Sequence, residues 1–566
     1  MSAALFRGIL TETGISRRRR DFMSKLTLVN GKIYVEKGVF VQALWAENGV
    51  ICGIGGSEEI PAEFLAGEVI DCQGRTVIPG LNDSHLHLVK VGTRMGQVKI
   101  SDAVSVDDLV GRVQNFMKVH PESCRYGISG GGWNQDLFTD EKRMPDRYDL
   151  DRISTRVPVV LSRICSHVVS VNSKALEMLG LDKEGRMVEG GTVECDEKGV
   201  PNGIFTETAV DLALSVVPEA TREDAMRDYL TAARYALSRG ITSVQSNDAG
   251  HCSYPTDMVL DVLHEIYSKD LCPLRYRGQV KLDSPEELED FAAAGGFCQP
   301  EDCDPNQFTL GSVKLFKDGS LGARTATMRR GYLDDPGNFG VESISGEDMD
   351  AYCRIADKYD LQVTAHVIGD AAVADTVSSY EKVLRDGKNP LRHTLIHCQI
   401  TDRPLLERIV KAEIPVVYQP IFLDYDMHAV ISRCGEELSS TSYAFKTLSD
   451  LGGCTAYSTD SPVEDCNPFP NIYSAVTRKD KNGWPEGGFF PQECVDVERA
   501  VDAYTTGSAF AEFHEHDKGR LKPGYFADLA VLDADIFTCD PMKIRDILPV
   551  LTVVGGKVAW KKKRIL

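Results

Sequence analysis

Two histidines stand one residue apart at the end of an apolar run, in the stretch VIPGLNDSHLHLVKVG of residues 77–92. In a β-strand alternate side chains share a face, so His85 and His87 would project together. Taken alone, the pair fits hydrogen-bonded core histidines nearly as well as two ligands of a metal ion. Potential metal ligands elsewhere in the chain decide between these two interpretations.

Three further potential ligands end later apolar runs: His366 in VTAHVIGD, His397 in HTLIHCQI and Asp460 in AYSTDSPVE. Imidazole nitrogens with a carboxylate oxygen suit zinc, and iron, manganese or nickel can take the same ligands. We therefore expect one or two divalent ions, most simply zinc, held by His85, His87, His366, His397 and Asp460.

Lys314 lies inside another such run, SVKLFKDG, on the same strand face as Ser312 and Phe316. A buried lysine must be neutralised or paired, because an isolated buried cation is very costly. One interpretation is a salt bridge, to Asp318 or to an acid elsewhere. The other is a carbamate formed from carbon dioxide, whose two oxygens could bridge two metal ions. The residues alone leave both open.

The expected chemistry follows from this set. A divalent ion lowers the pKa of a bound water from about 15.7 to roughly 7 and so supplies hydroxide at neutral pH. Asp460 is the expected general base and acid, taking the proton of the water and delivering it to a leaving amine. This chemistry requires no Ser, Cys or Thr nucleophile, and the sequence shows no dinucleotide fingerprint.

The other histidines are interpreted differently. His393 lies four residues before His397, about 13 Å down the same strand, which predicts a structural residue near the floor of the fold. For most of the rest we expect surface or helix-capping positions: His120, His251, His264, His428, His514 and His516.

The elements that must position these groups are eight apolar, β-branched runs that alternate with helix-like segments. They begin near residues 75, 240, 273, 311, 361, 392, 414 and 453. This alternation predicts an α/β fold, a (β/α)8 TIM barrel over residues 81–514, whose active sites lie at the carboxyl ends of the strands. The candidate ligands all fall at such ends.

One spacing departs from the pattern. The first run ends near residue 88 and the second begins near 240, whereas a βαβ unit needs only about 30 residues. We expect a large insertion after the first barrel strand, over about residues 100–235, that forms a lid or a substrate wall.

Both chain ends are rich in short strand patterns with turn signals, such as KLTLVNGKIYV and ILPVLTVVGGKVAW. Neither end can bury a core alone, so residues 23–80 and 515–566 are expected to form one small discontinuous β-sandwich domain. Residues 1–22, with the run SRRRR, are interpreted as a disordered or non-native extension.

Composition limits the class of protein. With 42% hydrophobic and 26% charged residues, the 566-residue chain is typical of a globular protein. Its net charge of -21 argues against nucleic-acid binding, and no apolar run is long enough for a membrane span. The 16 scattered cysteines indicate reduced thiols and a cytoplasmic location. The expected partner is a small-molecule substrate, with a homodimer as the candidate assembly.

The motifs together resemble the amidohydrolase superfamily, and more narrowly its YtcJ-like, or amidohydrolase 3, group, which includes N-substituted formamide deformylase. The resemblance runs from about residue 25 to 560 through PGLNDSHLHL, GGGWNQ, SHVVSVNSKAL, VKLFKDGSLGARTA, AHVIGDAAV and STDSPVEDCNPF. It implies the same five ligands and a carbamylated Lys314, with Lys317 the less suitable lysine. The insertion motifs imply substrate contacts by Trp133 and His167, although packing and local hydrogen bonding explain these two equally well.

Three departures from the group's pattern concern the substrate: Ile396, Asn134 and the SRICSH sequence before His167. The leading hypothesis is hydrolysis of an amide-type C–N bond, as in an N-acyl or N-formyl amine. The alternative is a cyclic amidase or a deaminase that uses the same site. A third hypothesis is a catalytically silent regulatory protein on the same scaffold.

Overall fold

The structure is a computed structural model, and it describes residues 24–121, 124–165, 167–217 and 220–563. The extension expected over residues 1–22 lies outside the described residues. Three sheet systems make up the described part: an eight-stranded parallel sheet, a pair of sheets built from the two chain ends, and a separate six-stranded sheet.

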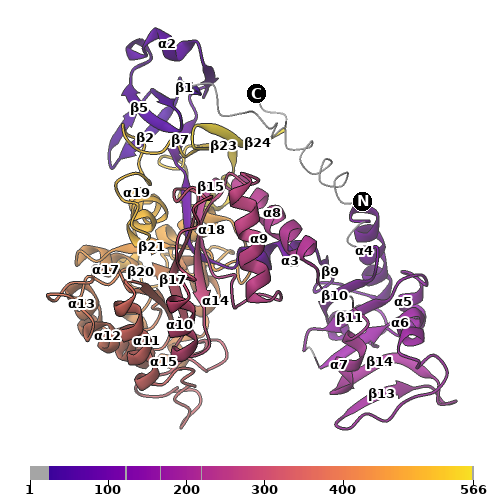
Figure 1. The fold of residues 1–566 in the computed structure, drawn as a ribbon. Helices are drawn as coiled ribbons and strands as arrows, with labels where there is room; N and C mark the ends of the chain where they lie inside the picture. Colours follow the sequence, from indigo (N-terminus) through magenta and orange to yellow (C-terminus); the bar gives the residue numbers. More distant parts are fainter. Residues whose placement is uncertain (1–23, 122–123, 166, 218–219, 564–566) are drawn as a thin grey trace.

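The eight-stranded sheet curves into a nearly closed barrel with consecutive parallel neighbours (Figure 1). The ring is completed where the first and last strands end: Asp460 N donates to His85 O at 3.0 Å, and His87 N donates to Ser461 O at 2.8 Å. Its strands are β8 (Leu81–Leu86), β15 (Ile241–Ser246), β16 (Arg275–Lys281), β17 (Phe308–Phe316), β18 (Gln362–Val367), β19 (Thr394–His397), β20 (Val416–Tyr418) and β21 (Thr455–Tyr457). Each of the eight predicted runs therefore contributes a strand to one TIM-barrel-like α/β fold.

Helices on the outside connect these strands, and their apolar faces join the strands in one hydrophobic cluster. Several begin at a side-chain cap, as at Ser284, Ser345 and Asp402, each of which accepts a bond from a first-turn amide. The main ones are α8 (Arg222–Ser238), α9 (Thr256–Ser268), α10 (Pro285–Ala293), α11 (Gly346–Lys358), α12 (Asp370–Glu381), α13 (Arg403–Lys411), α17 (Phe445–Asp450) and α18 (Pro468–Thr477). The last connection combines α19 (Val497–Asp502), the π-helical turn η5 (Ala503–Gly507) and α20 (Ser508–Ala511).

Strands from both chain ends pair with each other. One sheet has the order β5-β4-β1-β6 and the other β24-β23-β22-β7-β2-β3, with β22 antiparallel to β7. Apolar side chains of both sheets form one cluster. The strands are β1 (Lys25–Val29), β2 (Lys32–Glu36), β3 (Val39–Val41), β4 (Ala43–Glu47), β5 (Val50–Gly55), β6 (Glu68–Asp71), β7 (Thr76–Pro79), β22 (Leu529–Leu532), β23 (Pro549–Val554) and β24 (Lys557–Lys561).

Gly80 marks the point where the chain passes from these sheets into the barrel, between β7 and β8. A Cβ atom on Gly80 would lie 2.1 Å from the Thr242 hydroxyl, because the buried Thr242 side chain fills the space that a side chain at residue 80 would need. The single run that the sequence shows over residues 75–88 is thus two strands in two sheets.

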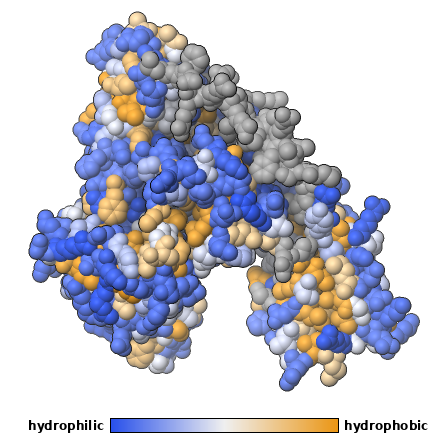
Figure 2. Space-filling view, viewed as in Figure 1, coloured by the Kyte–Doolittle hydropathy of each residue, from blue (hydrophilic) through white to orange (hydrophobic). Residues whose placement is uncertain are grey.

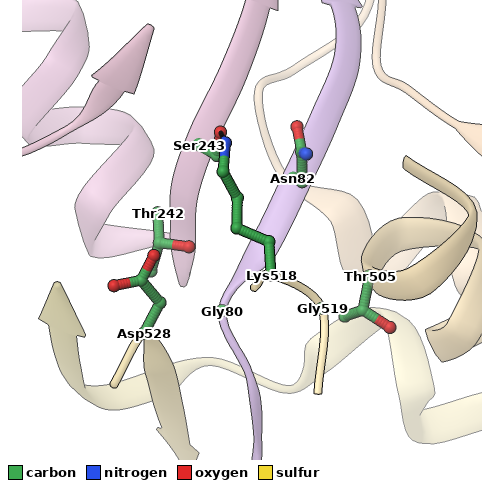
Figure 3. A pocket seen from close by; sticks show the side chains of 8 residues that line it. All are labelled: Gly80, Asn82, Thr242, Ser243, Thr505, Lys518, Gly519 and Asp528. Atoms are coloured by element: carbon green, nitrogen blue, oxygen red, sulfur yellow. Dashed lines mark hydrogen bonds between the residues drawn. The ribbon is translucent and has the colours of Figure 1, made fainter. Parts of the chain in front are cut away.

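The barrel floor next to this crossing is polar (Figure 3). The buried Lys518 ammonium lies 2.7 Å from Glu512 Oε1 and donates to Ser243 Oγ, while Asn82 Nδ2 donates to the same Glu512 oxygen. A cavity of about 10 Å³ beside them has room for one water. This end therefore holds a buried polar network away from the carboxyl ends of the strands.

The chain between β8 and β15 forms its own sheet, of order β13-β14-β12-β11-β10-β9, with two apolar clusters. Figures 1 and 2 show this lobe set to one side of the barrel, with open space between the two. α8 falls within the range expected for the insertion but packs in the barrel cluster. The lobe contains β9 (Val98–Lys99), α4 (Val106–Val119), β10 (Ile128–Trp133), η2 (Gln135–Leu137), α5 (Arg147–Asp151), β11 (Val159–Arg163), β12 (Val168–Val171), α6 (Ser173–Met178), β13 (Gly191–Cys195), β14 (Pro201–Glu207) and α7 (Ala209–Leu214).

Among the described helices, none combines the length and the apolar character that a membrane span requires.

Candidate metal centre

A pocket of about 400 Å³ lies at the carboxyl ends of the barrel strands. Five of the residues that line it are the predicted ligands: His85, His87, His366, His397 and Asp460. The structure thus brings together side chains that are up to 375 residues apart in the sequence, since residue 85 and residue 460 meet. The remaining wall comes from Lys90, Arg94, His251, Phe316, Pro462 and Val463.

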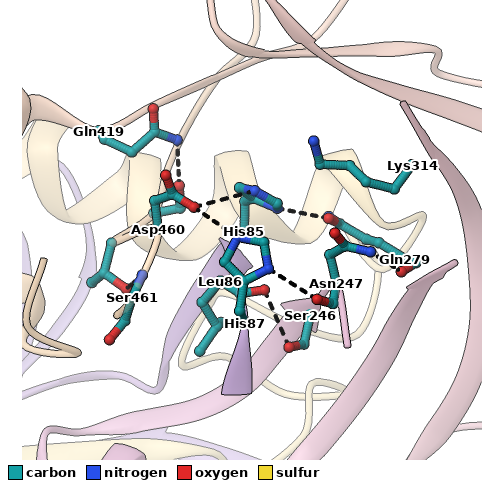
Figure 4. Close-up of polar contacts among 12 residues, drawn as sticks. His85, Leu86, His87, Ser246, Asn247, Gln279, Lys314, Gln419, Asp460 and Ser461 are labelled. Atoms are coloured by element: carbon teal, nitrogen blue, oxygen red, sulfur yellow. Dashed lines mark hydrogen bonds and ion pairs between the residues drawn. The ribbon is translucent and has the colours of Figure 1, made fainter. Parts of the chain in front are cut away.

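His85, His87 and Asp460 form a compact group of potential ligands in this pocket, with one ligand atom from each lying within 4.8 Å of the others. Asp460 Oδ1 lies 3.4 Å from His85 Nε2 and 3.2 Å from His87 Nε2, as Figure 4 shows. That oxygen is buried and has no hydrogen-bond partner among the residues that the structure describes. A buried carboxylate oxygen without a partner is costly, and a cation between these three atoms would satisfy it.

Contacts on the far side of three rings fix which nitrogen carries the proton. His85 Nδ1 lies 2.7 Å from Gln279 Oε1 and His87 Nδ1 lies 2.9 Å from Asn247 O (Figure 4). His397 Nδ1 lies 2.6 Å from Gln419 Oε1. Since each partner can only accept, Nδ1 donates and the Nε2 lone pair is free for a metal ion.

His366 completes the cluster with the opposite tautomer. Its Nε2 donates to Gly319 O at 2.8 Å, which leaves the Nδ1 lone pair available. Its ring centre lies 4.5 Å from that of His397, which in turn lies 6.1 Å from that of His85. The four rings therefore gather around one region of the pocket.

The protonation states of these groups suit a metal site. Burial lowers the pKa of His85 and His366 well below the usual value and lowers the pKa of His397 to about 4. Positive charge near Asp460, on a neighbouring ring or on a bound cation, lowers the pKa of its carboxyl and offsets the opposing effect of burial. Neutral imidazoles beside an ionised carboxylate are the forms that ligate a divalent ion.

Lys314 is fully buried on β17, and Figure 4 draws its amine end on the side of His85. Its Nζ donates to Leu315 O at 3.1 Å and lies 3.7 Å from the centre of the Phe316 ring. Burial lowers the pKa of this amine to about 7. Within the described ranges no carboxylate forms an ion pair with Lys314, whereas the Lys317 ammonium pairs with Glu342. The salt bridge to Asp318 is absent from this part of the chain.

Two of the candidate ligands have an unusual backbone conformation. Asp460 has φ of 52° and His397 has φ of 74°, in the left-handed region that side chains other than glycine rarely adopt. Such positions cluster at functional sites, where the surrounding structure holds them in place.

Comparison with known proteins identifies the scaffold. The sequence model of the Amidohydrolase family matches residues 68–559, most of the chain. The chain belongs to the amidohydrolase family. The resemblance inferred from the motifs is thereby confirmed, and family membership supports a metal-dependent hydrolase.

Relatives of this amidohydrolase align over nearly its full length. YtcJ of Bacillus subtilis (strain 168), which is classed as an amidohydrolase, is 31% identical over 94% of this chain and 98% of its own. The N-substituted formamide deformylase of Arthrobacter pascens is 23% identical over 95% of this chain and 99% of its own. The crystal structure of an uncharacterized metal-dependent hydrolase from Pyrococcus furiosus superposes with a TM-score of 0.71 at 30% identity, covering 91% of this chain and 100% of that one.

The two substrate contacts predicted in the insertion are not part of the amidohydrolase pocket. Trp133 is fully buried in the lobe's own cluster, where Nε1 donates to Leu161 O at 2.9 Å. His167 is exposed and lies 3.0 Å from Glu207 Oε2. Neither side chain lines the pocket, because the lobe stands apart from the barrel mouth. Substrate contact by these residues stays a prediction.

Sequence reasoning missed several residues around the centre. His251 was expected in a surface or capping position, yet it lines the pocket, with its ring centre 4.8 Å from that of His87. It follows β15 by five residues in an irregular loop, where no periodicity signals a site. Gln279 and Gln419 were visible only as single polar residues in or beside apolar runs. His393 lies away from the pocket, where Nδ1 accepts from Val363 N at 3.0 Å.

The Gln279 amide should control metal affinity through His85. In Gln279→Met the Nδ1 proton loses its acceptor, and we expect zinc affinity to fall about tenfold to hundredfold, the usual effect of removing such a partner. Gln279→Glu keeps an acceptor oxygen and should stay near the parent value. Competition with a chromophoric chelator measures both, and exposed Gln97→Met is the control. Unchanged affinity in Gln279→Met would remove this role.

Proposed function

We propose that this amidohydrolase cleaves the C–N bond of a small-molecule amide, such as an N-acyl or N-formyl amine, with a metal-activated water. The observation that carries the proposal is the unpartnered Asp460 Oδ1, which faces the Nε2 lone pairs of His85 and His87 inside a pocket of about 400 Å³. Pockets of this size accept small molecules.

The proposed ligands are His85, His87, His366, His397 and Asp460, and zinc suits their nitrogens and oxygen best. Lys314, carbamylated on its amine, would add an anionic ligand and allow a second ion. When bound, a divalent ion supplies a Lewis acid for the substrate carbonyl and an acidified water. Imidazoles ligate a metal ion in their neutral form, so Asp460 and the carbamate would be the negative charges that the protein contributes at the centre.

Asp460 has the position and the charge of a general base. It would take one proton as the water oxygen bonds to the amide carbon, and pass that proton to the nitrogen as the C–N bond breaks. The products are then a carboxylic acid and an amine, with all atoms accounted for. A buried carboxylate at this position would hold the proton close to both reacting atoms.

The deformylase relative supports an amide substrate, since its name assigns it N-substituted formamides. At 23% identity this support extends to the type of bond and leaves the acyl group and the amine to be identified.

The experiment combines metal analysis with product analysis. Purified protein should contain at least one equivalent of a divalent ion per chain, and a panel of N-formyl, N-acyl and cyclic amides should yield a carboxylate and an amine. Ring opening or ammonia release would favour the cyclic amidase or deaminase instead. Protein made with ample zinc that holds no metal and is silent on the whole panel would contradict the proposal.

A further inference from the structure

Helix α3 (Leu88–Met95) leaves the metal centre directly, since it begins at the residue after His87. One side of the helix is buried and carries Leu88, Val89 and Val91. Lys90 and Arg94 lie one turn apart on another side, and both line the pocket. Because α3 follows the HxH motif directly, it places two cationic side chains beside the candidate ligands.

Lys90 is half-buried and has no hydrogen bond or ion pair within the part of the chain that the structure describes. Burial lowers its pKa, and Cys252, Asp248 and Asp460 partly offset that effect. Asp248 does not neutralise it directly, because its carboxylate already accepts from Val89 N, Ser246 Oγ and the Tyr276 hydroxyl. A partly buried ammonium without a direct partner is costly, and an anion in the pocket would stabilise it.

Arg94 is held at the rim of the same pocket. One of its guanidinium nitrogens donates to Pro462 O at 2.5 Å, which leaves the other donors of the group free to bind a ligand. Glu464 lies near enough to interact with Arg94, and burial raises the pKa of Glu464 to about 7. The positive charge of Arg94 is therefore not fully cancelled near neutral pH.

We propose that Lys90 and Arg94 bind a carboxylate on the amine part of the substrate, so that this enzyme hydrolyses N-acyl amino acids or related amido acids. The inference rests on the proposed function. Two cations offer the donors that the two oxygens of a carboxylate need. The first two amides of α3, which could otherwise assist a larger anion, are already bonded: Leu88 N donates to Ser246 Oγ and Val89 N donates to Asp248. Phe316, Pro462 and Val463 supply apolar wall for the rest of the molecule.

The test compares matched substrates: N-formyl-, N-acetyl- and N-benzoylglycine, each against its neutral carboxamide. We expect the ratio of kcat/KM values, carboxylate over carboxamide, to fall on the order of tenfold to hundredfold in Lys90→Met, as for a partly desolvated charge pair. Lys90→Arg keeps the charge and should stay within about threefold of the parent. Lys118→Met, at an exposed position on α4, is the control. A ratio that Lys90→Met leaves unchanged would overturn the inference.

A binding arm separates failure of the inference from failure of the proposed function. In the Asp460→Asn background, calorimetry should show N-benzoylglycine binding more tightly than its carboxamide, and Lys90→Met should remove that difference. If no pair is turned over, the proposed hydrolysis fails while this arm still tests the carboxylate site. Equal binding of acid and carboxamide to the parent background would overturn the carboxylate site itself.

Discussion

Replacing Asp460 by asparagine lowers kcat/KM by about a thousandfold or more and leaves the fold intact. The change keeps the shape of the side chain but removes the charge that faces His85 and His87 and the group expected to carry the proton. General acid–base catalysis alone contributes about 10² to 10⁴ in rate, and a weakened ligand adds to the loss. Activity on the amide panel, metal content and the melting temperature are measured on the same preparation.

Asp465→Asn is the matched control for this variant. Asp465 lies in the same segment after β21 but is exposed and accepts from the Tyr235 hydroxyl, away from the pocket. Its activity should stay within about threefold of the parent. An Asp460→Asn protein that holds its metal and keeps more than about a tenth of the activity would exclude Asp460 as the proton carrier.

The sequence predicted the barrel and the clustering of the candidate ligands because both depend on local patterns. The eight runs are apolar and β-branched, and each is bounded by turn residues, so strand position could be assigned without knowing the contacts. Alternate residues of a strand share a face, which places His85 and His87 together. Parallel strands run in the same direction, so His366, His397 and Asp460 come to the same end of the barrel.

The groups that orient the ligands could not be predicted in this way. Gln279 meets His85 across 194 residues, a contact that depends on strand register and on the closure of the ring. At Gly80 one apolar run passes from one sheet into another, where Thr242 lies close by. A pattern of apolar residues gives no sign of this change of sheet. The placement of the insertion depends on how two folded units meet. Its apolar Trp133 looks the same in sequence whether it packs or binds.

Replacing Lys314 by alanine should cost at least one equivalent of bound metal per chain and about a thousandfold or more in activity. The amine is fully buried, donates to the Leu315 carbonyl oxygen and lies over the Phe316 ring, and among the described residues it has no ion pair. Its pKa of about 7 leaves much of it neutral near physiological pH. A neutral amine can add to carbon dioxide and release one proton, and the resulting carbamate supplies the ligand that the unmodified lysine lacks.

A pair of substitutions distinguishes this carbamate from a structural role of Lys314. Lys314→Ala leaves space, so short carboxylic acids such as formate or acetate should partly restore metal and activity, whereas Lys314→Met fills that space and should resist rescue. Lys281→Ala, on the paired position of β16, is the control, since the Lys281 ammonium pairs with Asp283. Carbon-13-labelled bicarbonate should give a carbamate signal in the parent protein only when Lys314 is present. Full metal content in Lys314→Ala would exclude the bridge, because the imidazoles and Asp460 would then hold every ion without it.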